Sequence, residues 1–154
     1  MKETITKFYE AFKNKDAESM VALYHEEVIF SDPAFGILHG NRAKNMWRML
    51  IENGKDLEVN FEVISADEKK AKAHWQAKYT FSKTGRRVVN EVDAYFLFKD
   101  GLIIKHVDDF NRKEWAKQAM GLKGRLFGGT GFFRDQLYKN TKVLLDKFEA
   151  KNNG

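Results

Sequence analysis

Alternation of apolar and polar residues between positions 57 and 109 constrains this chain more than any other feature. The alternation has a period of two over 57–63, 71–81, 87–98 and 102–109, which is typical of strands with one buried face. These runs follow one another and are joined by short turn signals, so the pattern predicts four antiparallel strands in one sheet. Apolar side chains occur on both faces of the third run, which favours helices on one side of the sheet and a partner subunit on the other.

Helical spacing of apolar residues appears on both sides of this strand region. Asp16, Asn41 and Asn111 precede apolar stripes at i, i+3 and i+4, and each can cap the helix that follows. The glycine-bearing stretch 121–132 is expected to be a flexible crossing, or a lid, before the last helix. The expected helices span residues 4–13, 17–24, 41–52, 112–120 and 133–151.

This order of elements predicts an α+β fold shaped like a cone, with N-terminal helices packed over a curved antiparallel sheet and an extra C-terminal helix. A chain of 154 residues is expected to form one domain, in which 121–154 is a loop and helix extension of the cone formed by 1–120. Aromatic residues make up 14% of the chain, including 13 Phe, which indicates a thick core, a ring-lined cavity, or both.

Composition excludes several classes of protein. The absence of cysteine rules out disulfides, thiolate metal sites and a cysteine nucleophile. The net charge is +5, but the basic residues are scattered among acidic ones without a nucleic-acid-binding fingerprint, which favours a solvated surface with a mild preference for anionic ligands. No apolar run is long enough to span a membrane. We therefore expect a cytoplasmic protein with neither a nucleic-acid nor a membrane partner.

Metal and nucleotide sites are not expected either. The order His106-Val107-Asp108 matches half of a non-haem iron triad, but no histidine follows it in the chain. The glycines between 121 and 132 lack the Gly-Lys-Ser/Thr ending of a phosphate-binding loop. The sequence thus predicts no metal site and no cofactor.

An acidic residue in apolar surroundings is the first candidate for chemistry. Asp32 precedes Pro33, the only proline, within VIFSDPAFGILHG. Proline restricts the residues before it to extended geometry, so it ends a short strand and determines where the Asp32 side chain points. A carboxylate near Ile29, Phe30 and Ile37 is either a turn residue facing water or a group held in a pocket.

The stretch HVDDF at the end of the last strand contains a second candidate. Alternation places His106 and Asp108 on one face, together with Ile104 and Phe110, and Asp109 on the other. A histidine and an aspartate two residues apart can share a proton and orient each other, as chemistry at a carbon acid requires. The alternative is a core or interface histidine beside an aspartate of a strand-end turn.

Two stretches, FYEAFKNKDAESMVALYHEEVIFSDPAFGILHG and DAYFLFKDGLIIKHVDDF, resemble the nuclear transport factor 2-like superfamily. The resemblance covers about residues 4–120 and is to the SnoaL-like and ketosteroid-isomerase-like branch in particular. It implies a cone with a pocket. Because members differ in function, it supports a pocket more firmly than a reaction.

Family roles carried onto this sequence give specific candidates. By resemblance to the ketosteroid isomerases, Asp32 is the general base and Tyr9 the donor to the oxyanion, and a second donor falls near Asp93. A slip of one residue would turn Asp93 away from the pocket. By resemblance to the SnoaL-like cyclases, the base is instead Asp108 or its neighbour Asp109, with His106 beside it.

The resulting hypothesis is an enzyme without a cofactor that transfers a proton on a small apolar molecule bearing a carbonyl group, as an isomerase or cyclase does. The alternative is a non-catalytic ligand-binding or protein-binding domain of the same fold. Asp32 or Asp108 would be the base and Tyr9 or His106 the donor. A homodimer through the outer sheet face is also expected. The expected substrate-binding residues are Tyr24, Phe30, Trp47, Trp75, Tyr79, Asn90, Phe110 and Trp115.

Overall fold

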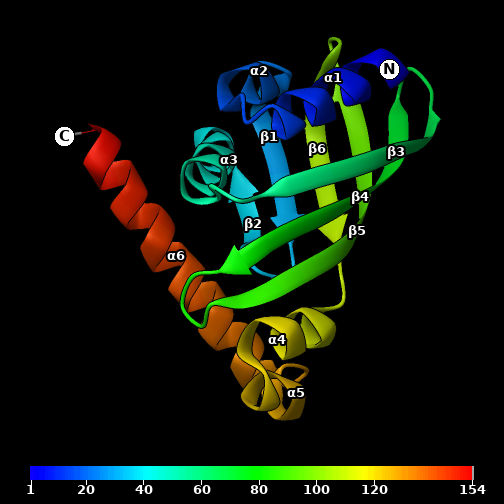
Figure 1. Cartoon of the computed structure of the whole chain (residues 1–154). Coiled ribbons are helices and arrows are strands. Elements are labelled where there is room, and N and C mark those ends of the chain that lie inside the picture. Colours follow the sequence, from blue (N-terminus) through cyan, green and yellow to red (C-terminus); the bar gives the residue numbers. More distant parts are fainter. Residues whose placement is uncertain (154) are drawn as a thin grey trace.

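A curved six-stranded sheet, with strand order β2-β1-β6-β5-β4-β3, wraps around the N-terminal helices in a computed structural model that describes residues 1–153 (Figure 1). All neighbouring strands pair antiparallel except β1 and β6, which are parallel. The strands are β1 Tyr24–Asp32, β2 Gly36–His39, β3 Glu58–Ala66, β4 Lys70–Phe81, β5 Arg86–Lys99 and β6 Leu102–Asp109. The helices are α1 Lys2–Lys13, α2 Ala17–Val21, α3 Asn41–Asn53, α4 Arg112–Met120, α5 Leu122–Phe127 and α6 Gly131–Asn153.

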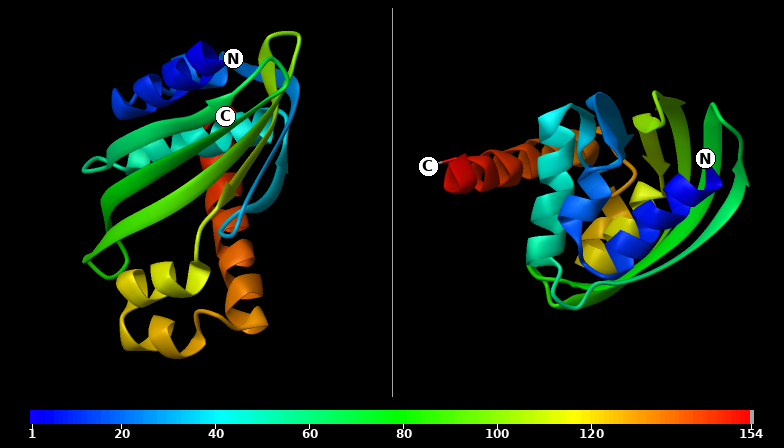
Figure 2. Two further views of the ribbon diagram at one scale, coloured as in Figure 1. Left: turned by 90° about the vertical axis from the view of Figure 1, so that its right-hand side faces the viewer. Right: turned by 90° about the horizontal axis from the view of Figure 1, so that it is seen from above.

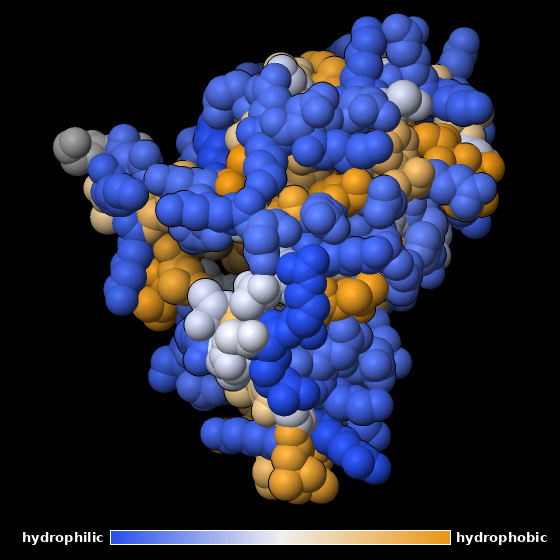
Figure 3. All heavy atoms as spheres, in the orientation of Figure 1, coloured by the Kyte–Doolittle hydropathy of each residue, from blue (hydrophilic) through white to orange (hydrophobic). Residues whose placement is uncertain are grey.

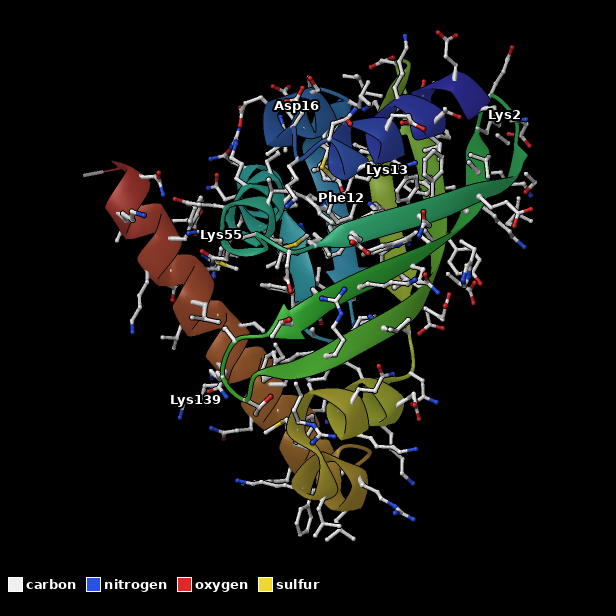
Figure 4. All side chains as sticks on the ribbon, in the orientation of Figure 1. Lys2, Phe12, Lys13, Asp16, Lys55 and Lys139 are labelled. Carbon is white, nitrogen blue, oxygen red and sulfur yellow. The ribbon has the colours of Figure 1, made fainter. Side chains whose placement is uncertain are left out.

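Helices α1, α2 and α3 lie on the concave side of the sheet, as the two turned views show (Figure 2). Helix α1 buries Ile5, Phe8 and Phe12, which are spaced along one face as a 3.6-residue period requires. Figure 4 shows Phe12 on the side of α1 that faces the sheet. The predicted α+β cone with N-terminal helices and a C-terminal helix is therefore confirmed.

The four strands predicted from alternation are present as β3 to β6, and consecutive strands pair antiparallel. One detail of the prediction is wrong. The pairing of β5 with β6 shifts between Leu97 and Phe98, so Ile104 has no partner in the ladder. This bulge turns Ile103 into the core beside His106, whereas strict alternation would have placed Ile104 there.

The chain around Asp32 forms a hairpin that the sequence did not indicate. Strand β1 turns at Asp32 and returns as β2, so that Asp32 pairs with Gly36, whose φ of +70° favours glycine.

The following helix, α3, is not capped by Asn41 as predicted. Its cap is Gly40, which makes no side-chain hydrogen bond, and Asn41 is already the first helical residue. The predicted caps Asp16 and Asn111 are confirmed by their bonds to the helices they precede.

Most of the stretch 121–132, predicted to be a flexible crossing or lid, is the short helix α5 and a turn. Helix α5 packs closely on α4. A Cβ atom at Gly124 would lie 1.9 Å from the backbone oxygen of Ala116, so the two helices can approach only because this position lacks a side chain. Gly128 meets the same alanine one turn later.

Helix α6 runs back along the molecule and contacts α3 (Figure 1). Glu149 accepts hydrogen bonds from both Arg42 and Asn45, and Arg42 also pairs with Asp146 at 2.8 Å. These contacts fasten the C-terminal extension to the body of the cone. None of the helices within 1–153 is long and apolar enough to cross a membrane.

Candidate functional site

A cavity of about 820 Å³ lies between the concave face of the sheet, α3 and the helices α4 to α6. Figure 3 shows the surface hollowed between the β4–β5 turn and α6. The lining is mainly apolar, which suits a ligand whose own surface is largely apolar. Representative lining residues from different elements are Phe35, Met46, Leu57, Val92, Phe110 and Leu144.

Asp32 lies in the wall of this cavity, at the end of β1. Its Oδ1 atom accepts hydrogen bonds from the backbone N–H groups of Ala34, at 2.8 Å, and Phe35, at 2.6 Å. No residue among 1–153 donates to the second oxygen, Oδ2. The Asx turn created by these bonds therefore holds the carboxyl group in place and leaves one oxygen available to a ligand.

Burial raises the pKa of Asp32 from 3.8 to about 7. The negative charge of Asp108 adds to this rise, while the two backbone hydrogen bonds oppose it. A carboxyl group with a pKa near 7 is present in both protonation states at neutral pH. It can both remove a proton and return it, which is the property that a general base needs.

Asp108 ends a chain of hydrogen bonds that passes through the core. Tyr24 Oη accepts a hydrogen bond from Trp47 Nε1 at 2.8 Å and lies 2.7 Å from His106 Nδ1. Because the carboxylate of Asp108 can only accept, the imidazole proton lies on Nε2, which donates to Asp108 Oδ1 at 2.8 Å, and Nδ1 accepts from the Tyr24 O–H group. Trp75 Nε1 donates to the same oxygen of Asp108 at 3.3 Å. This chain fixes the orientation of the Asp108 carboxylate at the cavity wall.

A second polar pair lines the cavity on β4 and α4. Tyr79 Oη accepts a hydrogen bond from Trp115 Nε1 at 2.7 Å. Its own proton has no acceptor among residues 1–153, so it can be donated to a ligand in the cavity. Burial raises the pKa of Tyr79, and the charge of Asp32 raises it further. The phenol is therefore protonated at neutral pH and lies within electrostatic reach of the Asp32 carboxyl group.

Four of the residues predicted from the sequence lie behind the cavity rather than on its wall. Tyr9, Tyr24, Phe30 and His106 are fully or almost fully buried, and none of them is among the lining residues in the described part of the chain. The Tyr9 hydroxyl has no hydrogen-bond partner among residues 1–153. Its ring stacks on Phe61, with 5.2 Å between ring centroids, so Tyr9 packs as a core residue.

The other predicted residues do meet at the cavity. Asp32 and Asp108 both line it, so the structure places the two alternative bases in one site. The predicted binding residues Trp47, Trp75, Tyr79, Asn90, Phe110 and Trp115 line it as well.

Asp93 lies on the opposite, outer face of the sheet. Its carboxylate bonds to His74 Nδ1 at 2.9 Å, and Glu91 bonds to Nε2 of the same ring at 2.6 Å. The one-residue slip considered for the resemblance has therefore occurred, and Ala94 faces inward in its place. Within 1–153, no group of three or more His, Asp or Glu residues is placed to hold a metal ion.

The cavity residues on α5 and α6 were missed by the sequence analysis. Phe127, Phe133, Gln136 and Asn140 line the cavity, although their segment was expected to be a loop followed by an ordinary packed helix. The available signal was the aromatic cluster around the glycines, GLKGRLFGGTGFF, which is unusual for a solvent-exposed crossing.

The cone, its inward-facing carboxylates and its apolar cavity define the class of domain as nuclear transport factor 2-like. Residues 5–106 match the family model described as the SnoaL-like domain. The chain therefore belongs to the SnoaL-like family. No curated protein matches the sequence.

Solved structures with the same fold include proteins with different names. A candidate polyketide cyclase from Xanthomonas campestris pv. campestris is 21% identical, with a TM-score of 0.66, over 76% of this chain and 94% of that one. A candidate isomerase from Bacillus subtilis is 24% identical, with a TM-score of 0.60, over 77% and 91%. An epoxide hydrolase of M. tuberculosis is 18% identical, with a TM-score of 0.59, over 82% and 89%. At these identities the likeness is one of fold.

Proposed function

We propose that this protein is an enzyme that removes a proton from a small, largely apolar molecule bearing a carbonyl group and returns it elsewhere, as an isomerase or cyclase does. The observation that carries the proposal is the position of Asp32. Its pKa is near 7, one of its oxygens is unengaged among the described residues, and it faces an apolar cavity of about 820 Å³. A carboxyl group that served only to form the turn would not need to lie in a cavity wall.

Proton transfer in this site would use two groups of the chain. Oδ2 of Asp32 takes the proton from the carbon next to the carbonyl group, and the electron pair of the C–H bond moves onto the carbonyl oxygen. Tyr79 donates a hydrogen bond to that oxygen as its negative charge develops. The Trp115 N–H group, bonded to Tyr79 Oη, makes the phenol a better donor. Asp32 then returns the proton, so the substrate is rearranged without any net oxidation.

Asp108 has a supporting role in this proposal. Its negative charge helps to raise the pKa of Asp32, and the bonds from His106 and Trp75 keep its own carboxylate fixed. The competing assignment makes Asp108 the base, as the resemblance to the cyclases implies. The two assignments differ in what each variant does. If Asp32 is the base, Asp32→Asn removes turnover, whereas Asp108→Asn keeps it and shifts its pH dependence.

Exchange of hydrogen for deuterium tests the proposal without knowledge of the natural substrate. The assay follows loss of the protons next to the carbonyl group of 1-tetralone, a bicyclic aromatic ketone, by NMR in deuterated buffer. We expect the wild-type protein to accelerate exchange and Asp32→Asn to reduce the acceleration by about 10²-fold or more. Tyr79→Phe should reduce it by about 10-fold or more, because one donor to the oxyanion is lost.

The matched control is Asp93→Asn, since Asp93 carries the same group on the outer face. It should exchange the ketone at the wild-type rate. If Asp32→Asn and wild type accelerate exchange equally, the proposed mechanism is wrong. Ketone that binds to the wild-type protein without any exchange would instead favour the non-catalytic ligand-binding domain.

A further inference from the structure

The lower end of the molecule, formed by α5 and the start of α6, exposes large apolar side chains to solvent (Figure 1). Phe132 is 79% exposed, Leu122 71%, Leu126 63% and Phe127 53%. Figure 3 shows hydrophobic spheres projecting at this end between hydrophilic ones. We call these four residues the apolar tip. Such a cluster of exposed Leu and Phe side chains is unusual on a soluble surface and indicates a docking site.

The packing of α5 on α4 forces this exposure. Gly124 and Gly128 lie one helical turn apart and face α4, where any Cβ atom would collide with Ala116. Leu122 and Leu126 are offset from these glycines by two positions, or about 200° around the helix, so they point away from the protein. Rotating α5 so that Leu122 and Leu126 become buried would break its contact with α4.

The segment of the chain that contains the tip also carries its net charge. The segment from Arg112 to Lys139 has seven Lys or Arg and two Asp or Glu, a net charge of +5, while the rest of the chain has twenty of each sign. Figure 4 shows nitrogen-ended side chains spreading around this end of the molecule. Among residues 1–153, Lys113, Lys123 and Arg125 have no carboxylate within ion-pair distance.

We propose that the apolar tip is a docking site for an anionic membrane surface. Leu and Phe side chains would enter the boundary between headgroups and acyl chains, while the surrounding Lys and Arg residues bind the lipid headgroups. This inference departs from the sequence-based expectation of no membrane partner. That expectation rested on the lack of an apolar run long enough to span a bilayer, which contact with the bilayer surface does not require.

A lipid surface fits the tip better than a second copy of the chain does. Two copies meeting through their tips would bring together two segments of net charge +5, and this repulsion opposes association. The tip projects from the molecule. A bilayer surface needs no complementary pocket to bind a projecting apolar group, whereas a protein partner does. Phe127 and Phe132 belong both to the tip and to the cavity lining, so a bilayer at the tip would lie against one end of the cavity.

Vesicle binding by the full-length chain tests this proposal without any assay of activity, and so independently of the proposed function. Each basic residue near an anionic surface strengthens binding about fivefold. Lys113, Lys123 and Arg125 together therefore predict about a hundredfold stronger binding to anionic vesicles than to neutral ones. The vesicles would contain phosphatidylcholine alone, or with about one third phosphatidylglycerol. Binding should weaken as salt is added.

The double variant Leu122→Ser/Leu126→Ser should lower binding to the anionic vesicles about tenfold or more. Neither residue lines the cavity, and both are exposed, so folding should be preserved. The matched control is Ile37→Ser/Ile64→Ser, which removes two exposed isoleucines from strands away from the tip and should bind as wild type does.

Site-specific fluorescence locates the contact. Because the chain has no cysteine, Leu126→Cys can be labelled with the environment-sensitive dye NBD at a single site, with Ile64→Cys as the matched control. We expect the emission of the label at 126, but not at 64, to move to shorter wavelength on anionic vesicles. Equal binding to neutral and anionic vesicles, or no shift at 126 in bound protein, would overturn the proposal. A complex of two chains that only the leucine double variant separates would show that the tip is a protein interface instead.

Discussion

Replacement of Asp32 with Asn is predicted to stabilise the protein increasingly as the pH rises. Burial raises the pKa of this carboxyl group from 3.8 to about 7. The folded protein therefore keeps a proton on Asp32 at pH values where the unfolded chain has already released it. The sign follows from this difference: the folded state binds more protons, so the free energy of unfolding falls as the pH rises from about 4 to about 7.

The size of the effect follows from the same two pKa values. Each pH unit over which only the folded state holds the proton lowers the free energy of unfolding by 1.36 kcal/mol, so the total is about 4 kcal/mol. An asparagine has no proton to lose, and its amide oxygen can still accept from the N–H groups of Ala34 and Phe35. The stability of Asp32→Asn minus that of wild type should therefore increase by about 4 kcal/mol between pH 4 and pH 8.

Urea unfolding of both proteins at several pH values measures this difference, and the changes in all other carboxyl groups cancel in it. Asp67→Asn is a control for which the pH dependence of the stability difference should have the opposite sign. Hydrogen bonds from the N–H groups of Lys69 and Lys70 lower the pKa of Asp67, so its replacement should cost stability at neutral pH and not in acid. If the difference for Asp32→Asn stays constant between pH 4 and pH 8, the reasoning about its burial is wrong.

Three further predictions concern the site, the C-terminal helices and the assembly. The rate of proton exchange should rise with pH to a plateau above about 7, and Asp108→Asn should move this rise to lower pH, because it removes a charge that raises the pKa of Asp32. Gly124→Ala should lower stability by about 1–3 kcal/mol in thermal unfolding, since its Cβ atom has no room, whereas Gly129→Ala should be nearly neutral. We also propose a homodimer through the outer sheet face, so Leu97→Lys, at an exposed apolar position of β5, should convert a two-chain mass to one chain in light scattering.

Features set by neighbouring residues could be predicted from the sequence. The strands β3 to β6 follow from alternation alone, because a period of two is a property of each segment by itself. The bounds of α4, Arg112–Met120, agree with the prediction because Asn111 caps the helix and Gly121 ends it. The bulge at Ile104 and the hairpin β1–β2 were missed, since each depends on how one strand pairs with another.

Features of the site that depend on distant residues could not be predicted in the same way. The bond from Tyr24 to His106 joins residues 82 positions apart, and nothing near either residue shows that they meet. Tyr24 was therefore predicted to bind substrate, although it packs behind the cavity and orients His106. Tyr79, the donor in the proposed mechanism, was predicted from the sequence only as a binding residue, because its bond from Trp115 exists only in the folded chain.

The two carboxyl groups in the cavity wall, Asp32 and Asp108, differ in the groups that donate hydrogen bonds to them. Asp108 accepts hydrogen bonds at Oδ1 from two buried side chains, those of His106 and Trp75. Asp32 likewise accepts at one oxygen, but its two donors are backbone N–H groups of its own turn, and its burial makes ionisation cost stability. An asparagine would form the same turn without that cost. A turn alone therefore does not account for an acid at this position, whereas a proton acceptor facing an apolar ligand requires one.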